Sequence, residues 1–145
     1  MTELELQAQV ADYLRLQYPD VIFHSDFGSG VKLTMGQAIK QKRLNGGRRS
    51  WPDMFIAKPK LMQSKDGLPV VIHGLFLELK KDGVRILKRD GSYVSDEHIR
   101  EQAKMLQALE RNGYRARFAV GFDQAKRIID EYVGRKKEGA DIIEF

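Results

Sequence analysis

Apolar residues recur at the three- and four-residue spacing of helices in three long parts of the chain. Residues 3–17 carry such a stripe, and Thr2 stands where a capping residue is expected. A second stripe predicts a helix that Ser95 caps and that runs to Arg111, and a third predicts a last helix capped by Asp123. The apolar positions of the three faces are Leu6, Val10, Tyr13 and Leu14; Ile99, Ala103, Leu106 and Leu109; and Ala125, Ile128, Ile129 and Val133.

Shorter apolar runs between these helices predict strands. A polar segment over residues 58–74 separates two of them and is expected to form a hairpin or a loop, and the turn at residues 89–91 is typical of a β-hairpin. A short helix capped by Thr34 is expected up to Arg43. The expected strands are residues 21–23, 53–57, 75–79, 84–87, 92–94 and 114–122. This order predicts an α/β sandwich around a central mixed sheet.

Length and composition fit one domain that folds on its own. The chain has 145 residues, of which 42% are hydrophobic, so we expect a domain over residues 1–134 followed by a polar tail over residues 135–145. The absence of cysteine excludes a disulfide scaffold, a cysteine-ligated metal site and a thiol nucleophile. We expect neither a membrane span nor a secretory signal, and hence a protein that stays inside the cell.

Positive charge is unevenly distributed along the chain. The net charge is +5, and one run of ten residues without an acid holds five cations, which either contact phosphates or form a solvated loop. A second basic group is diluted by Asp82 and Asp90 and is the weaker candidate. The first group is Lys40, Lys42, Arg43, Arg48 and Arg49, and the second is Lys80, Lys81, Arg85, Lys88 and Arg89.

Candidate catalytic residues stand at the ends of two apolar runs. Alternation along residues 75–80 places Glu78 and Lys80 on one face of a strand, and Asp53 follows Pro52 at the head of another strand. Two carboxylates and a lysine suit phosphodiester hydrolysis, because the carboxylates can hold Mg²⁺ or Mn²⁺ while the lysine serves the attacking water. The alternative is a structural salt bridge between Asp53 and Lys80 with Glu78 solvated.

The order of these residues resembles a known nuclease motif. Pro52-Asp53 followed by Glu78-Leu79-Lys80 is similar to the PD-(D/E)xK nucleases. A helical wheel also turns Glu3 toward the apolar face of the first helix and Glu5 away from it. The wider pattern resembles the virus-type replication-repair nuclease (VRR-NUC) family of phages and bacteria, through Glu3-x-x-Leu6-Gln7, Pro52-Asp53, Glu78-x-Lys80 and Gln102.

This resemblance implies a fold, a site and a substrate class. The implied fold is restriction-endonuclease-like, and the implied partners are DNA, in particular branched DNA, and a second copy of the chain. The implied metal ligands are Glu3, Asp53, Glu78 and the backbone carbonyl of Leu79, with Lys80 and Gln102 completing the site. The chain departs from the family in having Ser50-Trp51 before Pro52, and in the long gap between Asp53 and Glu78.

The remaining motifs bear on which cofactors and which functions are expected. No glycine-rich segment is followed by the Lys-Ser/Thr of a phosphate-binding loop, so we expect no nucleotide cofactor. Trp51 is a candidate for stacking on a base or for a core anchor, and His24, His73 and His98 show no metal-ligand spacing. The main hypothesis is a Mg²⁺- or Mn²⁺-dependent DNA endonuclease, structure-selective and used in replication, recombination or repair in the cytoplasm of a bacterium or phage-infected host. The alternatives are a catalytically silent nucleic-acid-binding module and a structural subunit of a larger complex.

Overall fold

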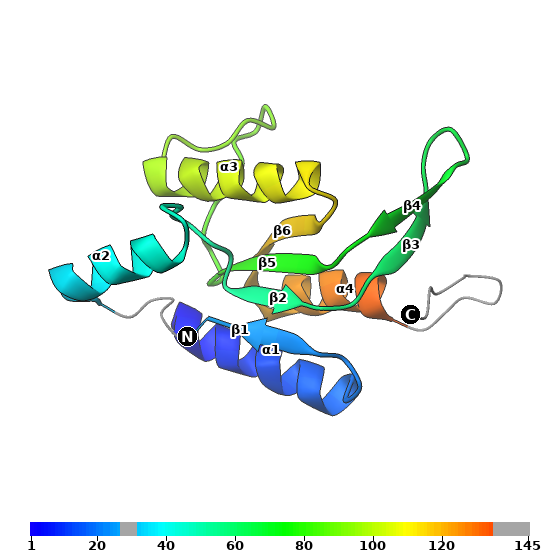
Figure 1. Ribbon diagram of the computed structural model, residues 1–145, viewed down its shortest axis with the longest axis horizontal. Helices are drawn as coiled ribbons and strands as arrows, with labels where there is room; N and C mark the ends of the chain where they lie inside the picture. Colours follow the sequence, from blue (N-terminus) through cyan, green and yellow to red (C-terminus); the bar gives the residue numbers. More distant parts are fainter. Residues whose placement is uncertain (27–31, 135–145) are drawn as a thin grey trace.

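The computed structural model describes residues 1–26 and 32–134 (Figure 1). Four helices and six strands form within these ranges. In chain order they are α1 (Glu3–Gln17), β1 (Phe23–Ser25), α2 (Met35–Leu44), β2 (Met54–Ile56), β3 (Lys60–Gln63), β4 (Pro69–Ile72), β5 (Leu75–Lys80), α3 (Glu97–Arg111), β6 (Arg115–Val120) and α4 (Gly121–Val133). The expected tail over residues 135–145 lies outside the described residues. No helix in the described ranges is both long and apolar enough to cross a membrane.

A four-stranded sheet with the order β1-β2-β5-β6 forms the centre of the molecule. β1 and β2 are antiparallel, as are β2 and β5, whereas β5 and β6 run parallel. In this register Leu77 of β5 lies opposite Met54 on one side and Arg117 on the other. The sheet is therefore mixed, and the predicted α/β architecture is confirmed.

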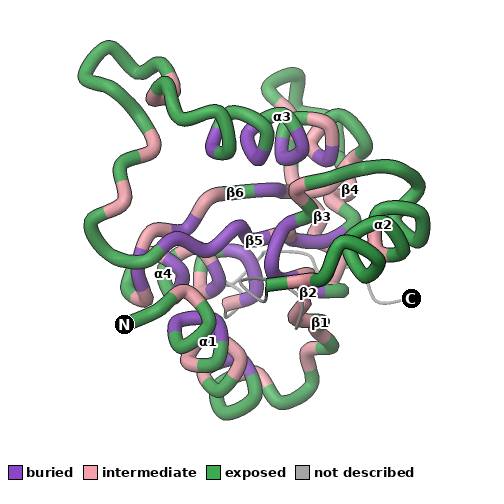
Figure 2. The backbone as a smooth tube through the Cα atoms, turned by 90° about the vertical axis from the view of Figure 1, so that its left-hand side faces the viewer, coloured by how far each residue is buried: buried purple, intermediate pink, exposed green. Residues whose placement is uncertain are grey.

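Alternation along β5 divides its side chains between two cores. Leu75, Leu77 and Leu79 are fully buried with the apolar faces of α1 and α4. Phe76 packs on the opposite face of the sheet, against α3. The helices thus form layers on both sides of the sheet (Figures 1 and 2). Because side chains alternate along a strand, Glu78 and Lys80 belong to the α3 side.

Local cap chemistry sets most of the helix starts. Thr2 and Thr34 both accept a hydrogen bond from the third residue of their helices, as predicted. The prediction for α3 was wrong by one residue: Asp96, rather than Ser95, accepts the N–H of Ile99 at 3.1 Å. Asp123 is not a cap either but lies in the first turn of α4, because β6 passes directly into the helix at its first residue.

Three strand predictions also need correction. The first strand is residues 23–25 rather than 21–23, because the N–H of Val21 is held in a turn by the carbonyl of Tyr18. The last strand ends at Val120, since Phe122 already belongs to α4. Residues 84–87 and 92–94 form only one isolated bridge, between Leu87 and Tyr93. Two short strands without a third neighbour make a weak ladder.

The segment over residues 58–74 forms a hairpin, as expected. Its strands β3 and β4 make a separate two-stranded sheet. The base of the hairpin is tied to the end of α4: the Lys60 ammonium donates to the carbonyl of Glu131 at 2.7 Å, and the Tyr132 hydroxyl donates to the carbonyl of Lys58 at 2.6 Å. Burial raises the pKa of Tyr132 to about 12. The insertion therefore lengthens the chain between Asp53 and Glu78 without separating β2 from β5.

Candidate active site

Asp53 is fixed at the point where β2 begins. The pairing of β2 with β5 reaches Met54 opposite Leu77, and the N–H of Leu79 lies beyond this last pair. The Asp53 carboxylate accepts this N–H at 2.7 Å. The Asp53 side chain thus accepts an N–H of β5 that no backbone carbonyl of β2 reaches. This hydrogen bond holds the Asp53 carboxylate beside β5, the strand that carries Glu78.

Glu78 is buried among polar partners. Its side chain is 3% exposed, and the Gln102 side-chain amide donates to its Oε1 at 2.7 Å. Burial, followed by the negative charge of Asp53, raises the pKa of Glu78 to about 9, although Lys80 opposes the rise. Without a cation in the site, Glu78 therefore keeps its proton at neutral pH. Its burial contradicts the alternative in which Glu78 is solvated.

Lys80 and Glu3 complete the charged surroundings of Glu78. Lys80 is 6% exposed at the end of β5, and its positive charge lowers the pKa of Glu78. Glu3, at the start of α1, is half-buried, and its negative charge contributes to the raised pKa of Glu78. Glu5 is exposed and instead accepts the N–H of Thr2 in the helix cap. Of the two acids, the structure therefore brings Glu3 toward the site.

The oxygen ligands at this site suit a hard divalent cation that keeps several bound waters. They do not form a site in which protein side chains alone enclose a metal ion. Nowhere in residues 1–26 and 32–134 do three His, Cys, Asp or Glu side chains gather closely enough to hold a metal ion. Two crowded carboxylates, on Asp53 and Glu78, nevertheless favour a cation between them. In addition, the buried Oε1 of Gln102 has no hydrogen-bond partner. Oxygen-only ligands suit Mg²⁺ or Mn²⁺, which retain several waters when bound. The residues that would hold such an ion are Asp53 and Glu78, with the Leu79 carbonyl. Glu3, predicted as a further ligand, does not lie close enough to these two carboxylates in this structure to form a three-acid site with them.

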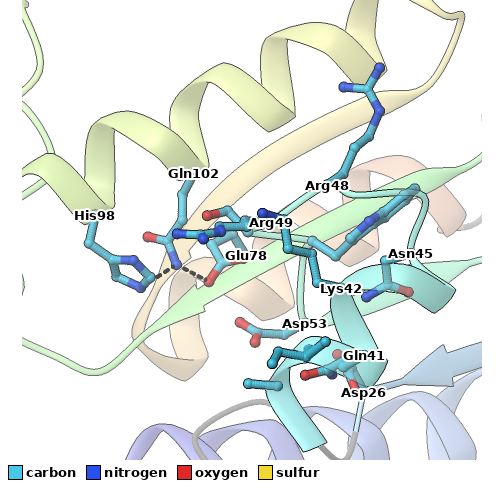
Figure 3. A pocket seen from close by; sticks show the side chains of 14 residues that line it. Asp26, Gln41, Lys42, Asn45, Arg48, Arg49, Asp53, Glu78, His98 and Gln102 are labelled. Carbon is cyan, nitrogen blue, oxygen red and sulfur yellow. Dashed lines mark hydrogen bonds between the residues drawn. The ribbon is translucent and has the colours of Figure 1, made fainter. Parts of the chain in front are cut away.

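A cavity of about 710 Å³ opens over these carboxylates (Figure 3). Its walls come from α2, from the chain between α2 and β2, and from the start of α3, while Asp53 and Glu78 line its base. Its polar and charged lining residues are Asp26, Gln41, Lys42, Asn45, Arg48, Arg49, Ser50, Asp53, Glu78, His98 and Gln102. The cavity thus combines acids at the base with cations on the wall.

The first basic cluster is divided between two surfaces. Lys42, Arg48 and Arg49 line the cavity, whereas Lys40 and Arg43 are not among its lining residues. All five side chains are exposed. A helix turns by about 100° per residue, so Lys40 lies roughly opposite Lys42 rather than beside it. The sequence run is continuous, but only part of it faces the candidate site.

Trp51 joins the cavity to the aromatic core. The indole is 38% exposed and lines the cavity, and its ring centroid lies 6.3 Å from that of Phe76. Phe76 in turn packs against Phe55 and Tyr114. Both interpretations of Trp51 are thus compatible with its position, since the residue packs against Phe76 and is still partly accessible from the cavity.

Two site residues were missed by the sequence reasoning. His98 lines the cavity, and its Nε2 lies 3.2 Å from Nε2 of Gln102 (Figure 3). The four-residue spacing of these two residues on one helix was the available signal. Asp26 also lines the cavity, and its N–H donates to the carbonyl of Asp53 at 2.8 Å. Gln7 holds this segment by donating to the carbonyl of Asp26 at 2.9 Å.

Comparison with known proteins finds a similar fold among solved structures but no match by sequence. No protein-family model matches the sequence, and no curated protein matches it. The structure is similar to a solved structure described as a "VRR_NUC domain protein", with a TM-score of 0.57 and 25% sequence identity. The match covers 92% of this chain and 88% of that chain. The similarity therefore supports a fold of the VRR-NUC type, which is restriction-endonuclease-like.

Proposed function

We propose that the protein is a metal-dependent DNA endonuclease. The similarity to a VRR_NUC domain protein suggests a nuclease. The observation that carries the proposal is that Asp53 and Glu78, both no more than 6% exposed, line the base of a cavity whose wall is basic. Lys80 does not line this cavity but is buried two residues beyond Glu78, at the end of the same strand. A structural role alone does not explain why the charge of one carboxylate acts on another at the base of an open cavity.

Each residue has a role in this proposal. A bound Mg²⁺ or Mn²⁺ would activate water and stabilise the charge that develops on the scissile phosphate. Asp53 and Glu78 would hold that ion, and the N–H of Leu79 orients the Asp53 carboxylate. Gln102 orients Glu78 through its amide. Lys80, at the end of the same strand, orients the attacking water or helps to deprotonate it.

In this proposal, the cations on the wall of the cavity bind the nucleic-acid backbone. Lys42, Arg48 and Arg49 line the cavity with exposed side chains that can contact phosphates flanking the scissile bond. Such contacts carry no sequence information, so they suit recognition of the shape of DNA. Branched DNA such as flaps and four-way junctions is the proposed substrate class, in bacterial or phage replication, recombination or repair, and a homodimer is the proposed assembly.

A cleavage assay on a panel of DNA structures tests the proposal. Labelled duplex, single-stranded, flap and four-way-junction DNA are incubated with wild type, Glu78→Gln and Glu101→Gln, in Mg²⁺, Mn²⁺ or chelator. Glu101 is an exposed acid on the same helix as Gln102, so its variant removes the same charge outside the cavity. We expect wild type and Glu101→Gln to cleave, and Glu78→Gln to lose about a hundredfold or more, by the magnitude typical of lost transition-state stabilisation.

Two other results would change the assignment. Cleavage that persists in chelator would contradict the metal-dependent mechanism. Salt-sensitive DNA binding without cleavage in either metal would favour the catalytically silent binding module, because the basic wall would then act without the carboxylates.

A further inference from the structure

The chain between β5 and α3 forms an exposed arm over residues 81–95. It leaves the sheet immediately after Lys80, the last residue of β5. Four cations project from it into solvent: Lys81, Arg85, Lys88 and Arg89. None of these four takes part in any of the ion pairs formed within residues 1–26 and 32–134.

The two acids of this arm are already engaged by local structure. Asp90 accepts the N–H of Ser92 at 2.9 Å and the hydroxyl of the same residue at 2.6 Å. The Asp82 carboxylate packs against Gly121, so closely that a methyl group at this glycine would overlap it. Gly121 begins α4, and an acid is favoured at the positive end of a helix dipole. Both acids keep their charge, so the four cations and two acids leave the arm with a net charge of +2.

The arm has a defined shape. The N–H of Lys88 donates to the carbonyl of Ser92 at 2.7 Å, and the N–H of Val94 donates to that of Ile86 at 3.0 Å. The Arg100 guanidinium donates to the carbonyl of Val94 at 3.1 Å, which ties the arm to α3. The cations are therefore presented from a fixed hairpin-like segment.

The arm and α2 flank the same face of the molecule. Figure 2 looks onto this face, with the exposed chain from β5 to α3 on the left and α2 on the right. The starts of α1 and α3 lie between them, below and above the sheet. A rod-like polyanion that crosses the cavity from α2 would therefore continue toward the arm.

We propose that this arm is a second contact surface for the DNA backbone, on the side of the site opposite to Lys42, Arg48 and Arg49. This inference rests on the proposed function, because the same DNA occupies both surfaces. The contact is electrostatic and independent of base sequence, since exposed cations bind phosphates as point charges. The arm holds substrate and does not take part in the chemistry, so its loss acts on binding.

DNA binding in the absence of cleavage tests the arm. The full chain is titrated into a fluorescent duplex in EDTA, at several salt concentrations, and binding is followed by anisotropy. The test variant replaces Arg85, Lys88 and Arg89 by Gln. The control variant replaces Lys65, Arg111 and Arg127 by Gln, which removes the same charge at exposed positions that do not line the cavity over the carboxylates.

We expect the arm variant to bind DNA about tenfold or more weakly than wild type at 0.1 M salt. The slope of log affinity against log salt concentration should fall by about 2 to 3, because each lost phosphate contact releases about one counterion fewer. We expect the control variant to retain most of the wild-type slope. At saturating DNA, the arm variant should keep the wild-type kcat while its KM rises. A single Arg89→Glu variant should weaken binding in the same direction.

The failures of the two proposals are distinguishable. If the arm variant and the control variant bind equally well while Arg48→Gln with Arg49→Gln weakens binding, the arm is not a contact surface and the proposed function stands. If wild type neither binds nor cleaves any DNA, the proposed function fails and the arm proposal fails with it. A fall in kcat at saturating DNA would contradict the assignment of the arm to binding alone.

Discussion

Asp53 and Glu78 depend on each other through charge and through the backbone between them. Asp53 accepts the N–H of Leu79, the residue that follows Glu78, and its charge raises the pKa of Glu78. An asparagine at position 53 can still accept this N–H through its carbonyl oxygen, but it carries no charge. The substitution therefore separates the positioning of the strand from the binding of a cation.

We expect Asp53→Asn to fold normally and to lose cation binding and cleavage. One of the two anionic ligands is removed, so Mn²⁺ affinity measured by calorimetry should fall by about tenfold or more, and cleavage by about a hundredfold. The pKa of Glu78 should fall, because the neighbouring charge that raises it is gone. Wild-type Mn²⁺ affinity in Asp53→Asn would remove this carboxylate from the ligand set.

The raised pKa of Glu78 predicts an unusual dependence of stability on pH in the metal-free protein. In the unfolded chain the carboxyl titrates near 4.5, whereas in the folded protein its pKa is raised to about 9. Between these values the folded state holds a proton that the unfolded state has released, so stability decreases as pH rises through this window. The slope from one such group is on the order of 1 kcal/mol per pH unit.

Chemical denaturation in EDTA from pH 5 to pH 9 measures this slope. We expect Glu78→Gln to flatten it and to be more stable than wild type near pH 8, because a neutral amide does not have to take up a proton on folding. Mn²⁺ should restore stability to wild type at high pH, since metal binding favours the deprotonated carboxylate. An identical pH slope in wild type and Glu78→Gln would show that the burial of this group does not control stability.

At the scale of secondary-structure elements, the packing of α1 against α4 depends on one aspartate. Asp130 of α4 accepts the hydroxyls of Tyr13 at 2.5 Å and Tyr18 at 2.7 Å, and Lys126 lies 3.1 Å from its other oxygen. Partial burial opposes ionisation, but these hydrogen bonds, that from Tyr13 foremost, hold the pKa of Asp130 below its usual range. Burial and the bond to Asp130 raise the pKa of Tyr13. This carboxylate therefore ties the C-terminal end of α1 to α4.

We expect Asp130→Ala to lower the free energy of unfolding by about 1 to 3 kcal/mol, because two tyrosine hydroxyls lose their acceptor. Urea denaturation measures the loss. Asp12→Ala is the matched control, since the exposed Asp12 side chain pairs with Arg15 at 3.9 Å, and exposed pairs contribute little. Equal effects of the two variants would mean that the tyrosine contacts do not stabilise the helix pair.

The outer edge of β6 is protected by side chains. The N–H of Arg115 points toward β5 and donates to the carbonyl of Gly74, so the next N–H along the strand points outward. Glu110 accepts this outward N–H, from Ala116, at 2.8 Å, and Gln124 accepts that of Val120 at 2.5 Å. Two of the donors that another strand would use are therefore occupied.

We expect Glu110→Ala with Gln124→Ala to increase self-association with concentration, measured by sedimentation velocity, because an unprotected edge can pair with another chain. Glu101→Ala with Gln107→Ala is the control, since it removes the same side-chain types from α3 away from the strand's outward N–H groups. If neither variant changes the sedimentation coefficient, the side-chain contacts are not what keeps this edge from pairing.

At the scale of helices and strands, features that depend on residues close together in the sequence were predicted better than features that depend on distant contacts. The helices capped by Thr2 and Thr34 were predicted well, because a capping box is decided within four residues. The first strand was displaced by two residues, because its register depends on β2, about thirty residues away. The face shared by Glu78 and Lys80 was predicted, since alternation alone decides it. The contacts of His98 and Asp26 with this site depend on which elements become neighbours, and neither was predicted.

At the scale of the whole molecule, charge is organised by the fold rather than by the order of residues. A continuous basic run is divided by α2 into Lys42, Arg48 and Arg49, which line the cavity, and Lys40 and Arg43, which do not. Conversely, the basic group after β5 lies on an exposed arm whose four cations outnumber its two acids. Sequence counts of charge could not show the division of the first run, because it depends on the direction in which side chains leave the backbone.

This division predicts different effects from variants that remove equal charge. Arg48→Gln with Arg49→Gln and Lys40→Gln with Arg43→Gln each remove two positive charges from the same segment, so any effect of net charge on long-range attraction is matched. We expect the first pair to raise KM about tenfold or more on the preferred DNA and to lower the salt slope by about 2, because both side chains face the substrate. We expect the second pair to change KM by less than about threefold, the size of a screened long-range effect. Steady-state kinetics across a salt series makes the comparison. If both pairs weaken binding equally, DNA lies along the outer face of α2 as well, and the cavity does not by itself define the path of the substrate.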